Sequence, residues 1–195
     1  MAGPSISKKI NSESLIKVCN LLNTITNEYT IFFGTMLGIH REGDIIDGDD
    51  DCDFLVPSKL YNKIKKLFLS NGYIVSNFDV KDHFTQFKSK IGDTEVLVDF
   101  YYYFDYDEEF IIDKWNFYGQ PFNEQKWMLI PKKYLFDFKK IKYKDSLIPI
   151  PKDPEYLCQY LYGERYKEKL IKSVDYQMMI INNKPKIVYK WKKNY

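Results

Sequence analysis

The chain has 195 residues, of which 45% are hydrophobic and 17% aromatic, so it can bury a core and is not a disordered protein. Lys and Arg number 29 against 27 Asp and Glu, which argues against a dedicated nucleic-acid binder and predicts no nucleic-acid partner. The three cysteines are widely spaced and fit neither a disulfide framework nor a paired-cysteine metal site.

Targeting signals are not evident in the sequence. The first five residues lack the apolar stretch of a signal peptide, and no segment has the length and apolarity of a transmembrane helix. We therefore expect a soluble, cytoplasmic protein with no transmembrane segment.

The first half of the chain alternates helical and extended patterns. The pattern predicts a helix over 12–28 with Ser12 as its cap, a strand over 29–33, a short helix over 36–40 and a polar loop over 41–50. A strand over 51–56 follows, then a helix that Ser58 caps and that stops at Asn71-Gly72.

Three more strands are predicted over 73–77, 84–91 and 95–103. This order predicts the α/β (α+β) class, with a mixed sheet flanked by helices. After residue 103 the pattern weakens, although two short strands within 132–151 and a helix over 154–169 are expected. We expect one domain over 1–195, with a core over about 12–105, a C-terminal part with a small helical element over about 106–170, and a basic tail over 171–195.

A Gly-Thr pair lies where a predicted strand gives way to a helix. Gly34 lets a ligand approach the backbone closely, and the free N–H groups of a helix start attract phosphate. Thr35 adds a hydroxyl donor. These two residues are candidate phosphate-binding residues.

Paired carboxylates open the next strand. Asp51 and Asp53 are two residues apart, so their side chains point to the same face of the strand, where they repel each other. A divalent cation removes this repulsion, and Mg²⁺ prefers one or two carboxylates together with water and substrate phosphates. The alternative is an aspartate-rich turn that binds nothing.

A third carboxylate, Asp99, interrupts an apolar strand pattern. On a strand beside the first, it would complete a three-carboxylate cluster that can hold two metal ions for phosphoryl transfer. The order of Gly-Thr, Asp-x-Asp and a later Asp is typical of the nucleotidyltransferase superfamily. Asp49 and Asp50 either tune the electric field of this site or bond the loop backbone.

Residues 34–53 resemble the signature of the LicD family, which includes fukutin and fukutin-related protein. The matching residues are Gly34, Thr35, Leu37, Gly38, Arg41, Gly43, Ile46, Asp49, Asp50, Asp51 and Asp53. A proline pair at 149 and 151 and the Tyr162-Gly163 pair resemble the closing element of the family. Asp47-Gly48 replaces the family's Pro-Trp pair, which puts in question what the loop recognises.

The resemblance implies a nucleotidyltransferase-like fold and an activity. Members transfer phosphocholine or a polyol phosphate, such as ribitol phosphate, from a CDP-linked alcohol donor to a glycan acceptor and release CMP. By position, Asp51, Asp53 and Asp99 would be the catalytic residues and ligands of Mg²⁺, or of Mn²⁺ in its place. Gly34 and Thr35 would contact donor phosphate, and Arg41 would neutralise it, unless Arg41 only pairs with the acidic loop, which is the polar loop over 41–50 with its four aspartates.

Two other functions use the same residues differently. A nucleotidyltransferase would move NMP from an NTP to a small molecule or another acceptor through the same carboxylates. A non-catalytic nucleotide- or glycan-binding protein would keep the fold without the chemistry, and the intact carboxylates argue against it.

Overall fold

The computed structural model describes residues 7–115, 126–169 and 187–189. The helices are α1 (Lys8–Asn23), α2 (Phe33–Glu42), α3 (Tyr61–Ser70), α4 (Lys132–Leu135) and α5 (Pro154–Tyr162), with 3-10 turns at Ser58–Leu60 and Glu164–Lys167. The strands are β1 (Thr30–Ile31), β2 (Asp51–Pro57), β3 (Ile74–Val80), β4 (Phe84–Ile91), β5 (Thr94–Asp105), β6 (Phe110–Asp113), β7 (Lys126–Pro131), β8 (Lys139–Tyr143), β9 (Ser146–Ile150) and β10 (Ile187–Tyr189).

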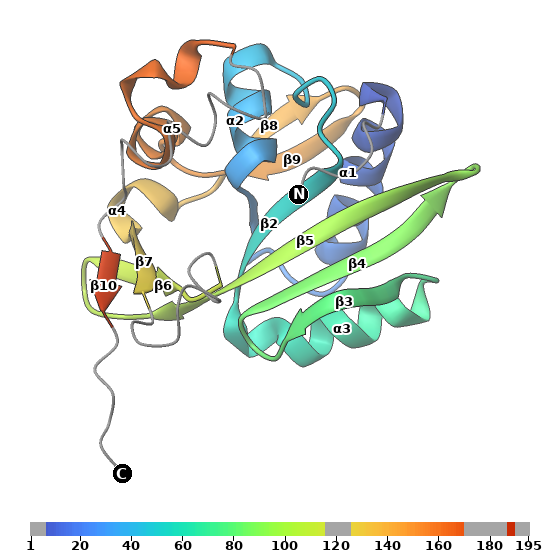
Figure 1. The fold of residues 1–195 in the computed structure, drawn as a ribbon, viewed down its shortest axis with the longest axis horizontal. Helices are drawn as coiled ribbons and strands as arrows, with labels where there is room; N and C mark the ends of the chain where they lie inside the picture. Colours follow the sequence, from blue (N-terminus) through green and yellow to red (C-terminus); the bar gives the residue numbers. More distant parts are fainter. Residues whose placement is uncertain (1–6, 116–125, 170–186, 190–195) are drawn as a thin grey trace.

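Eight of these strands form one mixed sheet (Figure 1). Its order is β1-β2-β5-β6-β7-β10, and β4, which also pairs with β3, lies on the edge of β5 opposite to β2. Strand β2 runs parallel to β5, whereas the other described pairs of the sheet are antiparallel. The predicted α/β class with a mixed sheet is confirmed, and the three strands predicted over 73–77, 84–91 and 95–103 correspond to β3, β4 and β5.

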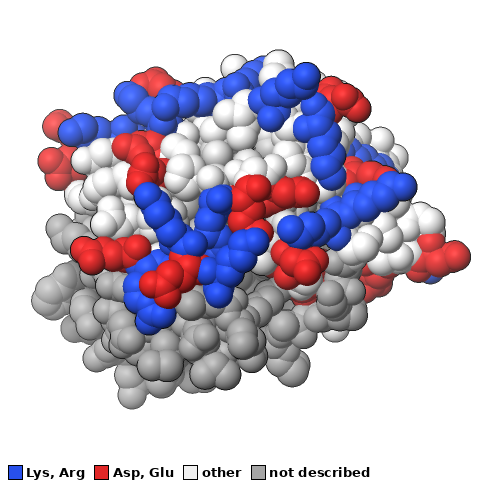
Figure 2. All heavy atoms as spheres, turned by 90° about the horizontal axis from the view of Figure 1, so that it is seen from above, with Lys and Arg blue, Asp and Glu red and all other residues white. Residues whose placement is uncertain are grey.

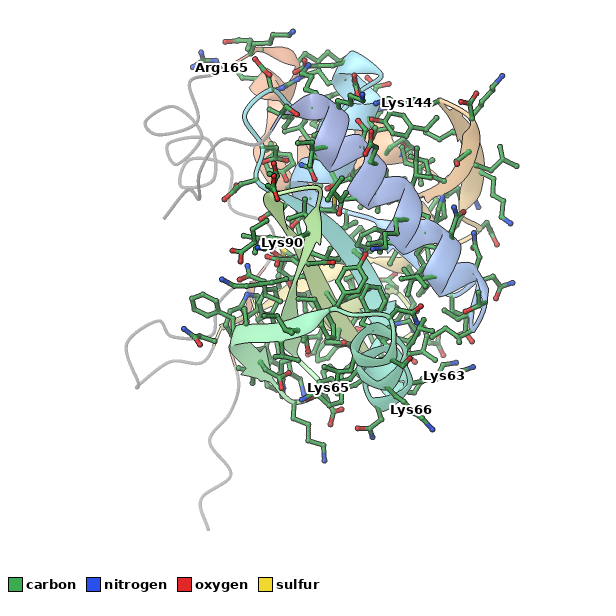
Figure 3. All side chains as sticks on the ribbon, turned by 90° about the vertical axis from the view of Figure 1, so that its right-hand side faces the viewer. Lys63, Lys65, Lys66, Lys90, Lys144 and Arg165 are labelled. Atoms are coloured by element: carbon green, nitrogen blue, oxygen red, sulfur yellow. The ribbon has the colours of Figure 1, made fainter. Side chains whose placement is uncertain are left out.

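Helices α1 and α3 lie across the same face of this sheet (Figure 3). Phe100 of β5 is fully buried there, with its ring centroid 5.5 Å from that of Phe54 on β2 and 5.0 Å from that of Phe68 on α3. Lys63 and Lys66 point from α3 toward solvent (Figure 3). Helix α3 is therefore amphipathic: its apolar face packs on the sheet and its basic face is in contact with solvent.

Helix α1 begins earlier than its apolar pattern predicts. The hydroxyl of Ser7 accepts a hydrogen bond from the Ile10 N–H at 3.5 Å, so Ser7 is the cap. The predicted cap, Ser12, is wrong: it lies within the helix, is buried, and its hydroxyl is 2.6 Å from the Tyr143 hydroxyl. A tertiary contact therefore determines the role of Ser12.

Helix α2 also begins earlier, at Phe33 rather than Met36, and β1 is shorter than predicted. The Gly-Thr pair consequently lies in the first turn of the helix. Further along, a Cβ at Gly38 would come within 2.8 Å of the Ile46 amide nitrogen and 2.9 Å of the Asp44 carbonyl oxygen. The helix can pack this closely on the acidic loop only because residue 38 is glycine.

The structure also differs from the predictions at β3, β6 and α5. Strand β3 continues to Val80, because Asp79 and Val80 still pair with Thr85 and Phe84 of β4. Strand β6 was not predicted, since four residues are too few for a periodic pattern. Helix α5 ends at Tyr162 rather than 169, because Gly163 adopts a φ of 82°.

The two short strands predicted within 132–151 are confirmed as the β8–β9 hairpin, which packs against β1 and α1. The predicted domain division stays a prediction, and the basic tail lies outside the described residues except for 187–189. Among the described residues, no helix combines the length and apolarity needed to cross a bilayer. On the face shown in Figure 2, the described acidic and basic side chains are interspersed.

Candidate active site

The three predicted carboxylates meet where β2 and β5 run side by side. The parallel register places Asp53 directly opposite Asp99, and Asp51 lies on the same face as Asp53 because side chains alternate along a strand. One carboxylate oxygen from each residue lies within 4.8 Å of the other two. Asp53 and Asp99 are each 5% exposed, so the cluster is held in a largely buried position.

The first turn of α2 contacts this cluster. The Thr35 N–H donates to Asp53 Oδ2 at 3.3 Å, and the Thr35 hydroxyl accepts from the Asp53 N–H at 2.8 Å. A Cβ at Gly34 would be 3.1 Å from Asp53 Oδ2 and 3.3 Å from Asp49 Oδ2. Thr35 therefore orients Asp53, and the lack of a side chain at Gly34 leaves room for the carboxylates.

The acidic loop adds two more carboxylates. Asp49 and Asp50 are 6% and 7% exposed, and with Asp51 they form a second group of carboxylate oxygens within 4.8 Å of one another. Both residues thus contribute negative charge near the cluster.

The electrostatics of the cluster favour a cation. Burial, followed by the charges of neighbouring carboxylates, raises the pKa of both Asp51 and Asp53 well above the usual range. Burial raises the pKa of Asp99 to about 7, although a hydrogen bond from Gln86 lowers it. Asp99 Oδ1 is buried and has no hydrogen-bond partner among the described residues.

These observations match the needs of a divalent cation. Mg²⁺ binds carboxylate oxygens and keeps coordination positions for water and phosphate. A cation would remove the repulsion between the carboxylates and provide a partner for the buried oxygen of Asp99. Asp51, Asp53 and Asp99 are therefore the residues that could hold a metal.

Comparison with known proteins identifies the family. The family model described as "LicD/FKTN/FKRP, nucleotidyltransferase domain" matches residues 27–153, which include all three carboxylates. The chain belongs to the LicD family. Membership supports a transferase of the phosphotransferase or nucleotidyltransferase type. No curated protein matches the chain.

Solved structures show the same fold at low sequence identity. The lincosamide antibiotic adenylyltransferase LnuA, with lincomycin bound, has a TM-score of 0.58 and 16% identity, covering 90% of this chain and 97% of that one. An antigenic nucleotidyltransferase-like protein from Paracoccidioides brasiliensis has a TM-score of 0.52 and 15% identity, covering 91% and 76%. The predicted nucleotidyltransferase-like fold is thus confirmed.

Arg41 of the LicD motif lies at the opposite end of α2 from the carboxylates. Its guanidinium donates to Glu42 Oε1 at 2.5 Å and to the carbonyl oxygens of Tyr166 and Glu168 at 3.3 and 3.2 Å. The structure therefore brings Gly34 and Thr35 to the cluster but places Arg41 against the chain that follows α5. Its phosphate contact stays a prediction.

Two residues near the site were not singled out from the sequence. Tyr101 follows Asp99 by two residues on β5, so it shares the face of the carboxylates, and its ring centroid is 4.6 Å from that of Phe33. Burial, followed by the charge of Asp53, raises the pKa of Tyr101. The spacing from Asp99 could have revealed Tyr101. The second residue is Asn11 of α1, whose side-chain nitrogen donates to the carbonyl oxygens of Asp49 and Asp51. Nothing in the sequence pattern points to Asn11.

Phe33 has a positive φ of 38°, which is rare for a residue with a side chain. It directly precedes the Gly-Thr pair. Backbone strain of this kind often occurs at functional sites, where the surrounding structure maintains it.

Two surface hollows lie elsewhere. One runs along α1, and the other, of about 680 Å³, is lined by residues that include Lys133, Tyr134 and Tyr156. Neither lining includes a residue of the carboxylate cluster.

Proposed function

We propose that this protein is a Mg²⁺-dependent phosphotransferase. It would move phosphocholine or a polyol phosphate, such as ribitol phosphate, from a CDP-activated donor to a glycan hydroxyl and release CMP. The observation that carries this proposal is the cluster of Asp51, Asp53 and Asp99 beside the first turn of α2 in a chain of the LicD family.

Each residue has a defined role in this proposal. Asp51, Asp53 and Asp99 would hold Mg²⁺, which when bound would neutralise phosphoryl charge and lower the pKa of a hydroxyl. Thr35 keeps Asp53 in place through its N–H and its hydroxyl. Gly34 and Thr35 would contact the donor phosphate at the helix start, where the missing side chain of Gly34 also leaves room for the carboxylates.

The reaction is a displacement at phosphorus. The acceptor oxygen forms a bond to the transferred phosphorus, and the bond from that phosphorus to the bridging oxygen of the donor breaks, so that CMP leaves with the electron pair. In this proposal Asp99, or a second metal ion, would help to remove the proton of the acceptor hydroxyl; Asp99 Oδ1 has no hydrogen-bond partner among the described residues. Arg41 reaches donor phosphate only if it leaves Glu42 and the carbonyl oxygens that it now contacts.

The test is thermal unfolding of the protein with CDP, CDP-choline, CDP-ribitol, CTP, UTP or ATP, each with and without Mg²⁺. A ligand at a hundred times its Kd stabilises the fold by about 2.7 kcal/mol, which raises the midpoint by about 5–10 °C for a chain of this size. We expect a Mg²⁺-dependent shift with the CDP-alcohols that Asp51→Asn abolishes. A protein that no cytidine nucleotide stabilises in the presence of Mg²⁺ would contradict the proposal.

Nucleotidyl transfer is the second candidate. The protein shares its fold with an adenylyltransferase over nearly the whole length of both chains, and this similarity favours nucleotidyl transfer as an alternative. In that reaction NMP moves from an NTP to a small molecule or another acceptor, and pyrophosphate leaves. Shifts with triphosphates but none with CDP-alcohols would favour this candidate, and product analysis for pyrophosphate against CMP would decide between the two.

A further inference from the structure

The polar residue Asn11 is completely buried on α1, next to the acidic loop. Its side-chain nitrogen donates to the carbonyl oxygen of Asp51 at 2.9 Å and to that of Asp49 at 3.2 Å. Both N–H groups of the Asn11 amide thus donate to backbone carbonyl groups, one on each side of Asp50.

The acceptor of the same amide is also occupied. Asn11 Oδ1 accepts from the thiol of Cys52 at 2.9 Å. A flipped amide would lose this bond and both bonds to the carbonyl oxygens, so the network permits one orientation. Cys52 lies between Asp51 and Asp53 and points away from the face that carries the carboxylates.

The next residue of α1 holds the other end of the loop. The hydroxyls of Ser12 and Tyr143 are 2.6 Å apart, and the Tyr143 hydroxyl donates to Asp44 Oδ1 at 2.5 Å. Two consecutive residues of α1 therefore contact the two ends of the loop that leads into β2. This loop contains Gly43 and Gly48, both with a positive φ that glycine adopts without strain.

We infer that Asn11 is a positioning residue for the carboxylate cluster. By holding the carbonyl oxygens of Asp49 and Asp51, it determines where β2 begins and how the Asp51 carboxylate meets those of Asp53 and Asp99. This inference rests on the proposed metal-binding role of the cluster. Asn11 precedes the region matched by the family model, which begins at residue 27.

The test measures metal binding rather than activity. The dissociation constant of Mn²⁺ is determined for the full chain by electron paramagnetic resonance of the free ion, at a temperature where each variant is folded. Asn11→Ala removes all three side-chain bonds, and Asn11→Ser keeps a hydroxyl that reaches at most one carbonyl oxygen. Ser14→Ala is the matched control, because Ser14 is equally buried on α1 and its hydroxyl has no partner among the described residues.

We expect Asn11→Ala to weaken Mn²⁺ binding by about 10-fold or more, as removal of groups that orient metal ligands does. Asn11→Ser should give an intermediate constant and Ser14→Ala the wild-type constant. If Asn11→Ala does not fold, the inference is tested by comparing the Mn²⁺ dissociation constants of Asn11→Ser and Ser14→Ala. A wild-type constant in a folded Asn11 variant would overturn the inference.

The wild-type protein and Asp53→Asn separate this inference from the proposed function. Binding of Mn²⁺ that Asp53→Asn abolishes supports the metal site, and then only the Asn11 variants test the inference. No Asp53-dependent binding in the wild type would overturn both.

Discussion

Three carboxylates share a largely buried position at the β2–β5 pair, and their mutual repulsion should affect stability. Burial raises the pKa of Asp99 from 3.8 to about 7. Because the folded state favours the protonated form, this group contributes stability that is fully present below pH 3.8 and is lost as the pH rises through about 7. The pKa values of Asp51 and Asp53 are raised as well, so they act in the same direction.

We therefore predict that the metal-free protein becomes less stable, by on the order of a few kcal/mol, between about pH 4 and pH 7. Urea unfolding in the presence of EDTA measures this change, and Asp99→Asn should reduce it because the amide does not titrate. Saturating Mg²⁺ should also reduce it by neutralising the carboxylates. Identical pH profiles for the wild type and Asp99→Asn would show that Asp99 does not contribute.

Helix α2 and the acidic loop pack so closely that a single methyl group should disturb them. Gly38→Ala would place a Cβ 2.8 Å from the Ile46 nitrogen, which is backbone and cannot rotate away. We expect a loss of about 1–3 kcal/mol in the free energy of unfolding, measured by urea titration.

Gly43→Asn is the control for that substitution. A Cβ at Gly43 meets no atom within 4 Å, and asparagine tolerates its φ of 70° better than most residues, so a loss below about 1 kcal/mol is expected. Equal losses for the two variants would show that the close contact at Gly38 is unimportant.

At the scale of the whole molecule, Arg41 connects α2 to the chain after α5. Arg41→Lys keeps the charge beside Glu42 but loses the planar fork that reaches two carbonyl oxygens. We expect the amides of Tyr166 and Glu168 to exchange hydrogen about 5- to 30-fold faster, because about 1–2 kcal/mol of local stability is lost.

Hydrogen exchange followed by mass spectrometry or NMR measures that change. Arg165→Lys is the comparison, because Arg165 pairs with Glu168 on the surface, where an ion pair contributes little. Unchanged exchange in Arg41→Lys would contradict a tethering role.

The sequence by itself determined the local features. The helical and alternating patterns predicted the mixed sheet, and the two-residue spacing placed Asp51 and Asp53 on one face, because such periodicity follows from backbone geometry. The ungapped motif from Gly34 to Asp53 also indicated the LicD family, since its residues are contiguous in the chain. The starts of α1 and α2 were predicted too late: Ser7 rather than Ser12 caps α1, and α2 begins at Phe33 without a side-chain cap.

Only the tertiary structure decided which distant residues meet. The parallel pairing of β2 with β5 brings Asp99 opposite Asp53, and the packing of α1 brings Asn11 to the acidic loop. The packing of α2 also directs Arg41 toward the chain that follows α5 instead of toward the carboxylates. Such contacts depend on how whole elements pack and pair, and local periodicity carries no information about the register between segments that are far apart in the chain.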